Sequence, residues 1–146
     1  MGQKIYVVDT NIILQDIQHL YDISDKGSNI IVIPETVLIE LEEKKKLLNE
    51  LGYHSRAFAR LLAKAKTKEV DHKKHFKVVK MLVDTIELHL ISKDRYESEM
   101  LEHNLSESND KRIIEIAEIA QHYYRGAKVH FLLSLIHISE PTRLRR

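Results

Sequence analysis

The sequence predicts an α/β fold in which strands alternate with helices around a parallel sheet. Short apolar, β-branched runs at Lys4–Val8 and Ile30–Ile33 are typical of buried strands, and helical spacing of apolar residues follows each. This alternation indicates βαβ units, whose strands run parallel. A length of 146 residues, with 43% hydrophobic and 31% charged residues, suits one globular domain.

The N-terminal elements are bounded by capping and turn residues. Asp9-Thr10-Asn11 ends the strand Lys4–Val8 and predicts a helix from about Asn11 to Tyr21. Lys26-Gly27-Ser28-Asn29 is a turn signal before the strand Ile30–Ile33.

Two helical stripes are expected in the middle of the chain, separated by Gly52. Pro34 closes the second strand and can open a helix, and Glu35 suits its first turn. The stripes consist of Val37, Leu38, Leu41, Leu48 and Leu51 before the glycine and Ala57, Phe58, Leu61, Leu62 and Ala65 after it.

The C-terminal half predicts a strand, an irregular segment, a helix and a last strand. The helix starts at Asp110, after the capping pair Ser108-Asn109, and has Ile113 and Ile114 on its apolar face. The other elements are a strand at Phe76–Val83, a loop with a short helix across Leu88–Leu105 and a strand at Ala127–Leu133.

Composition excludes several classes of protein. With no cysteine, the chain has no disulfide scaffold, thiolate zinc site, iron–sulfur cluster or cysteine nucleophile. No apolar run approaches the roughly 18–20 residues of a membrane span, and the N-terminus lacks the pattern of a signal peptide. We therefore expect a cytoplasmic protein with no membrane partner.

Charge is unevenly distributed along the chain. Lys44–Lys80 holds 12 Lys/Arg and 3 Asp/Glu, whereas Asp84–Glu118 holds 10 Asp/Glu and 4 Lys/Arg. Such runs are commonly solvated helix faces, but a basic block is also typical of phosphate-backbone binding. The candidate RNA-binding residues in this block are Lys44, Lys45, Lys46, Arg56, Arg60 and Lys64.

The segment Ser134–Arg146 resembles the conceptual translation of a transposase sequencing-library adapter. We expect a domain at 1–133 that is incomplete at its C-terminus, followed by a non-native tail at 134–146; a natural basic tail is the alternative. Without the tail, 20 basic residues face 21 acidic ones, and the formal net charge changes from +1 to −1.

Three carboxylates stand at positions where chemistry is expected. Asp9 directly follows the first strand, and open parallel sheets bind ligands at the carboxyl ends of their strands. Glu40 borders the apolar stripe of its helix, and Asp110 begins the predicted C-terminal helix. Two of them also have a structural role as the alternative, because Asp9 is a good helix cap and Asp110 suits a helix dipole.

Together these residues resemble the acidic motifs of PIN-domain ribonucleases. The segment from Gly52 to Ala57, GYHSRA, further resembles the PIN domain attached to some PhoH-like ATPases. The three motifs are Val7–Leu14 (VVDTNIIL), Val32–Leu41 (VIPETVLIEL) and Ser108–Ile114 (SNDKRII).

The resemblance implies a PIN-like three-layer α/β/α sandwich with a parallel sheet, truncated at its C-terminus. It also implies Mg²⁺- or Mn²⁺-dependent cleavage of RNA, with Asp9, Glu40 and Asp110 as metal ligands. Thr10 and Asn11 are implied to orient the first carboxylate or the substrate. The partners that the resemblance implies are RNA, a second copy of the chain and a C-terminal ATPase domain.

One departure from the family leaves the activity of this chain open. A further acidic motif is expected just after the strand Ala127–Leu133, where the adapter-like tail begins. The alternatives are a catalytically silent RNA-binding PIN module, a toxin-type PIN endoribonuclease and a phosphoacceptor α/β domain using Asp9. The acid-x-acid element of a dehalogenase-like phosphatase is absent, since position 11 is Asn.

Overall fold

The computed structural model describes residues 3–93 and 105–132, with all side chains in these ranges except those of residues 105–110. The predicted tail at 134–146 therefore lies outside the described residues. In chain order the elements are β1 (Lys4–Val8), α1 (Thr10–Gln15), α2 (Gln18–Ser24), β2 (Ile30–Pro34), α3 (Glu35–Lys44), α4 (Glu50–Lys64), β3 (Lys66–His72), β4 (Phe76–Val83), β5 (Ile86–Lys93), α6 (Leu105–Tyr123) and β6 (Lys128–Leu132).

The sheet is parallel at its centre and antiparallel at one side. Its strand order is β3-β4-β5-β2-β1-β6. The strands β5, β2, β1 and β6 are parallel, whereas β4 pairs antiparallel with β5 and β3 antiparallel with β4. The expected parallel sheet is thus present, and a two-stranded antiparallel ribbon extends it.

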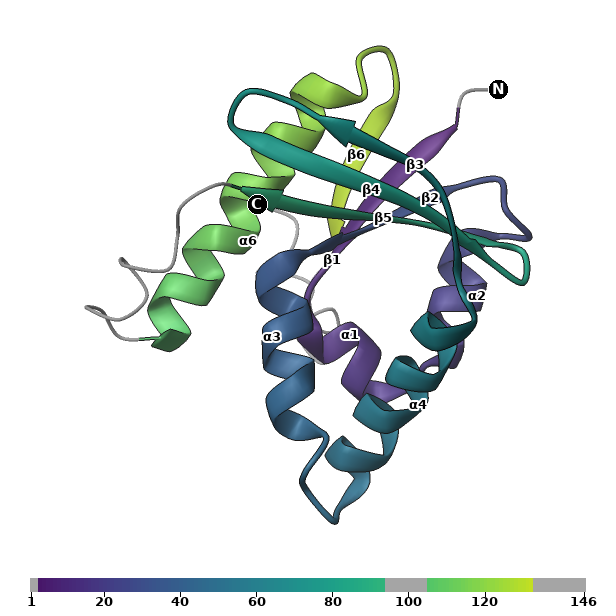
Figure 1. The fold of residues 1–146 in the computed structure, drawn as a ribbon, viewed down its shortest axis with the longest axis vertical. Coiled ribbons are helices and arrows are strands. Elements are labelled where there is room, and N and C mark those ends of the chain that lie inside the picture. The colour runs from purple at the N-terminus through teal and green to yellow at the C-terminus, as the bar shows by residue number, and fades with distance from the viewer. Residues whose placement is uncertain (1–2, 94–104, 133–146) are drawn as a thin grey trace, which may run out of the picture.

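Helices cover both faces of the sheet, which confirms the predicted α/β/α sandwich (Figure 1). The alternation along β2 shows why. Ile31 and Ile33 pack into a cluster with residues of α1, α3 and α4, whereas Ile30 and Val32 pack with residues of α6. Because β2 is central and buried on both sides, every one of its residues is buried.

The predicted helix from Asn11 to Tyr21 is two helices in the structure. Asp16 ends α1 with an extended backbone, φ −174° and ψ 125°. Its carboxylate accepts a hydrogen bond from the backbone N–H of Gln18, at 2.9 Å, in the turn that leads into α2. A side chain that competes for backbone groups in this way favours a break over helix continuation.

Gly52 lies inside α4 and does not separate the two helices as predicted. The break lies earlier, between Lys44 and Glu50. Asn49 caps α4, with its side-chain oxygen accepting from the Gly52 N–H at 3.3 Å. The Arg56 guanidinium donates to the carbonyl oxygens of Lys45 and Leu47, at 2.8 and 2.9 Å, which ties α4 to the end of α3.

Two strands and a helix start differ from the sequence prediction. The segment from Leu88, predicted as a loop with a short helix, begins with most of β5, whose Glu87 and His89 interrupt the apolar pattern of a buried strand. Residues 94–104 of that prediction lie outside the described residues. Strand β3 has no apolar alternation to read, because it is an exposed edge strand. Helix α6 begins at Leu105, ahead of the predicted start at Asp110. None of the helices in the described part of the chain is long and apolar enough to cross a membrane.

Candidate active site

The carboxyl ends of β1 and β2 lie side by side at one edge of the sheet, because these strands pair in parallel. Asp9 directly follows β1, and α3 starts directly after β2. We call this the carboxylate edge. It is the edge at which open α/β sheets place their ligands.

Asp9 caps α1 at this edge. Its backbone is extended, φ −97° and ψ 177°, and its carboxylate accepts from the Ile12 N–H at 3.2 Å. Its own N–H donates to the Leu132 carbonyl oxygen, at 3.2 Å, which ties the residue to the end of β6. The side chain is half-buried, so the cap geometry holds a carboxylate in place without removing it from solvent.

Thr10 brings Glu40 to the same edge. The Thr10 side chain is buried, and its hydroxyl donates to the Glu40 carboxylate across thirty positions of sequence. This hydrogen bond joins α1 to α3 and holds the half-buried Glu40 beside the residue that follows Asp9. Asn11 is exposed on α1, next to this contact in sequence.

Asp110 lies on α6, in a part of the helix whose side chains are outside the described set. Its position along the helix can still be followed. Ile113, one turn later, packs in the same core cluster as Val37 and Leu41 of α3, the helix that carries Glu40. The N-terminal part of α6 is therefore directed toward α3.

The donor atoms available at the carboxylate edge suit a hard divalent cation. Asp9 and Glu40 offer carboxylate oxygens, which are the ligands that Mg²⁺ and Mn²⁺ prefer. Among the side chains that the structure describes, no group of three or more acidic or histidine residues is close enough to hold a metal ion. The side chain of Asp110 lies outside this described set.

The six basic residues expected to bind RNA lie on the α3–α4 hairpin and the loop that joins its helices. Lys45 forms an ion pair with Glu42 at 3.2 Å. Arg56 donates to backbone carbonyl oxygens, which gives it a structural role that its sequence context did not reveal. RNA binding by Lys44, Lys45, Lys46, Arg56, Arg60 and Lys64 stays a prediction.

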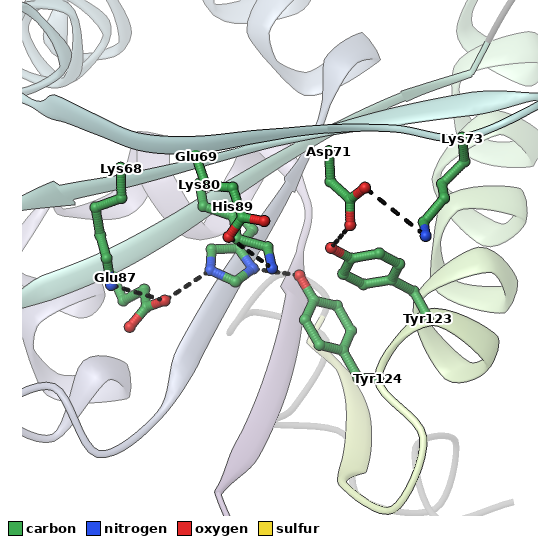
Figure 2. Close-up of polar contacts among 9 residues, drawn as sticks. All are labelled: Lys68, Glu69, Asp71, Lys73, Lys80, Glu87, His89, Tyr123 and Tyr124. Carbon is green, nitrogen blue, oxygen red and sulfur yellow. Dashed lines mark hydrogen bonds and ion pairs between the residues drawn. The ribbon is translucent and has the colours of Figure 1, made fainter.

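A buried polar network, absent from the sequence analysis, joins β5 to the end of α6 (Figure 2). His89 is 2% exposed, and its ring contacts the Tyr124 hydroxyl through Nδ1 and Glu87 through Nε2, the latter at 2.8 Å. Lys68 lies 3.5 Å from the same Glu87 carboxylate. Desolvation lowers the pKa of His89 despite the hydrogen bond to Glu87, so the ring is neutral in the folded protein at pH 7.

This network makes fold stability depend on pH. Because the pKa of folded His89 lies below that of the unfolded chain, protons bind preferentially to the unfolded state. The stabilisation is therefore complete above pH ~6.5 and is lost as the pH falls below it, by up to about 1.4 kcal/mol per pH unit. Urea denaturation between pH 5 and 8 should show this loss in the wild type and less of it in His89→Gln. Equal slopes for the two proteins would contradict the assignment.

Comparison with known proteins gives a family match and a partial relative. A family model described as "PIN domain" matches residues 6–135. "Protein PhoH2" of Bacillus subtilis (strain 168) is 39% identical over 59 residues, which are 40% of this chain and 13% of PhoH2. The match thus spans a small share of that relative's length. Among solved structures, none matches significantly.

Proposed function

The chain belongs to the PIN-domain family, and on that premise we propose that it is a Mg²⁺- or Mn²⁺-dependent endoribonuclease acting at the carboxylate edge. The PIN fold is generally a nuclease fold. The observation that supports the proposal most directly is the Thr10–Glu40 hydrogen bond, because it links the acid of α3 to the helix capped by Asp9.

In this proposal Asp9, Glu40 and Asp110 hold the cation, and Thr10 keeps the Glu40 carboxylate turned toward the edge. Exposed Asn11 orients the RNA or the first carboxylate. When bound, the divalent ion supplies Lewis-acid chemistry and offsets negative charge at the phosphodiester. Like-charged acids placed close together repel one another and are costly without a cation, so a site built from these three carboxylates would favour cation binding.

The proposed partner is RNA, and the match to PhoH2 supports a relationship to PhoH-like proteins. We propose that the natural protein resembles the N-terminal part of such a protein, with an ATPase domain and self-association as further expectations. A cytoplasmic location is proposed on the same basis.

The test is cleavage of a labelled RNA by the natural gene product, with Mn²⁺ or with EDTA. We expect cleavage only with the metal, and a rate at least about 100-fold lower in Asp110→Asn, because the neutral amide cannot replace the proposed carboxylate ligand. Glu118→Gln is the matched control, since it neutralises an exposed acid on the same helix. We expect it to cleave like the wild type.

Other outcomes point to other functions. RNA that is bound but never cut, with Mg²⁺ or Mn²⁺, would indicate a silent RNA-binding module. Cleavage that proceeds in EDTA, or that is unchanged in Asp110→Asn, would contradict the proposed site.

A further inference from the structure

The turn between β3 and β4 lies at the carboxylate edge. Strand pairing shows this, because Asp71 pairs with Val78, Val78 with Ile91, and Ile91 with Pro34, the last residue of β2. The turn residues Lys73–His75, with His72 at the end of β3, follow Asp71 and therefore extend past the level at which β2 ends. Figure 1 shows the turn on the side where β5 ends and α3 begins. Three strand spacings separate β4 from β1, which sets a minimum of about 14 Å, and the twist of the sheet adds to this distance.

The fold thus divides the basic block of the sequence between two edges. Lys66, at the start of β3, pairs with Leu82, which pairs in turn with Glu87 near the start of β5. Lys66 and Lys68 therefore lie toward the opposite edge, about 20 Å from the turn along the strand. Of the lysines on the ribbon, Lys73 and Lys74 are the two within the turn.

The turn concentrates positive charge. The three turn residues Lys73, Lys74 and His75 and the preceding His72 are all exposed, and none of them is acidic. Lys73 already forms an ion pair within the fold, because its Nζ lies 3.7 Å from the Asp71 carboxylate. Lys74 is directed into solvent, where it can meet a phosphate without breaking an ion pair that the structure describes.

The turn is closed by its own hydrogen bond and packs against α6. The Lys73 N–H donates to the Phe76 carbonyl oxygen at 2.8 Å, which closes the turn. Phe76 packs edge-on against Tyr123, with ring centroids 6.0 Å apart, and the Tyr123 hydroxyl donates to Asp71. Figure 2 shows Asp71 and Lys73 meeting Tyr123. A turn fixed in this way loses little conformational entropy when it binds a partner.

We propose that the β3–β4 turn is a docking surface for the RNA backbone that leads the strand onto the carboxylate edge. The inference rests on the proposed function and deepens it. A separation of at least about 14 Å corresponds to four or more stacked nucleotides at about 3.4 Å each. Contacts of this kind are made to phosphates, so they position the RNA without selecting its sequence.

The test measures binding of a fluorescently labelled 12-nucleotide oligouridylate to the full chain, in EDTA so that no metal-dependent cleavage occurs. We expect Lys73→Gln/Lys74→Gln to bind roughly tenfold more weakly at 0.1 M salt, with a log K against log salt slope smaller by about 1.4, or 0.7 per lost phosphate contact. Lys74→Gln alone should lose about half of this slope, and it leaves the Asp71 contact intact.

The matched control is Lys66→Gln/Lys68→Gln on the same ribbon. It removes the same charge, and the side chain of Lys68 is 48% exposed in an ion pair, against 47% for Lys73. We expect its affinity to stay within twofold of the wild type. Equal weakening by the two double variants would show that only overall charge matters and would overturn the proposal, as would absence of binding by the wild type.

Cleavage assays distinguish failure of the docking surface from failure of the proposed function. If the surface acts as proposed, Lys74→Gln raises KM and leaves kcat unchanged. If RNA is cut with unchanged KM, the docking proposal is wrong and the nuclease stands. If RNA binds through the turn but is never cut, the docking surface stands and the nuclease is wrong.

Discussion

Asp9→Asn should abolish metal-dependent RNA cleavage and leave the stability of the fold unchanged. Asn and Asp are equivalent helix caps, so the hydrogen bond from the Ile12 N–H survives the change. The amide cannot supply the negative charge that the proposed cation site requires. We expect cleavage to fall at least 100-fold while the free energy of unfolding changes by less than about 0.5 kcal/mol.

Asp9→Ala separates the two roles of the residue. It removes both the charge and the cap, so cleavage should be lost to the same extent, with an additional loss of about 1 kcal/mol in unfolding free energy. Cleavage rates with Mn²⁺ and urea denaturation of both variants provide the comparison. An Asp9→Asn protein that cleaves RNA normally would reduce Asp9 to a helix cap and remove it from the proposed site.

The parts of the fold that could be predicted are those with local signals. The strands β1 and β2 are short apolar runs that end in capping residues, and Asp9 stands directly after the first of them. The place of Glu40 beside the apolar stripe of α3 was also readable. The hydrogen bond from Thr10 to Glu40 was not, because it depends on how α1 and α3 meet in space.

The structure confirms the strand predicted at Phe76–Val83 as β4, but the pairing that makes it part of an antiparallel ribbon could not be predicted. The sequence of β3 has a single apolar residue, Val70. Strand β5 contains Glu87 and His89, and hydrogen bonds between these two residues and from His89 to Tyr124 compensate their burial. Without β3 and β5, neither the place of β4 in the sheet nor its direction can be assigned from the sequence. The basic block then reads as one continuous surface, whereas strand pairing places Lys66 and Lys74 toward opposite edges.

Gly52→Ala should destabilise the α3–α4 hairpin. A Cβ atom at this position would lie 1.8 Å from the Leu47 carbonyl oxygen and 2.9 Å from the Arg56 guanidinium. The arginine could move, but the carbonyl belongs to a backbone that Arg56 and the Asn49 cap hold in place. Ala would otherwise favour a helix by about 1 kcal/mol, so the sign of the effect distinguishes the two influences.

We expect steric overlap to prevail, with a net loss of about 2 kcal/mol or more in the free energy of unfolding of Gly52→Ala, measured by urea denaturation. Leu48→Ala is the control in the same connection, because Leu48 is 97% exposed and its truncation should change stability by less than about 0.5 kcal/mol. If Gly52→Ala were at least as stable as the wild type, helix propensity would dominate. The close approach of the Leu47 carbonyl oxygen to position 52 would then be contradicted. A loss confined to Gly52→Ala would instead explain why the GYHSRA segment needs its glycine, which leaves room for the connection between the helices. The arginine of the same segment, Arg56, binds the carbonyl oxygens that this connection presents.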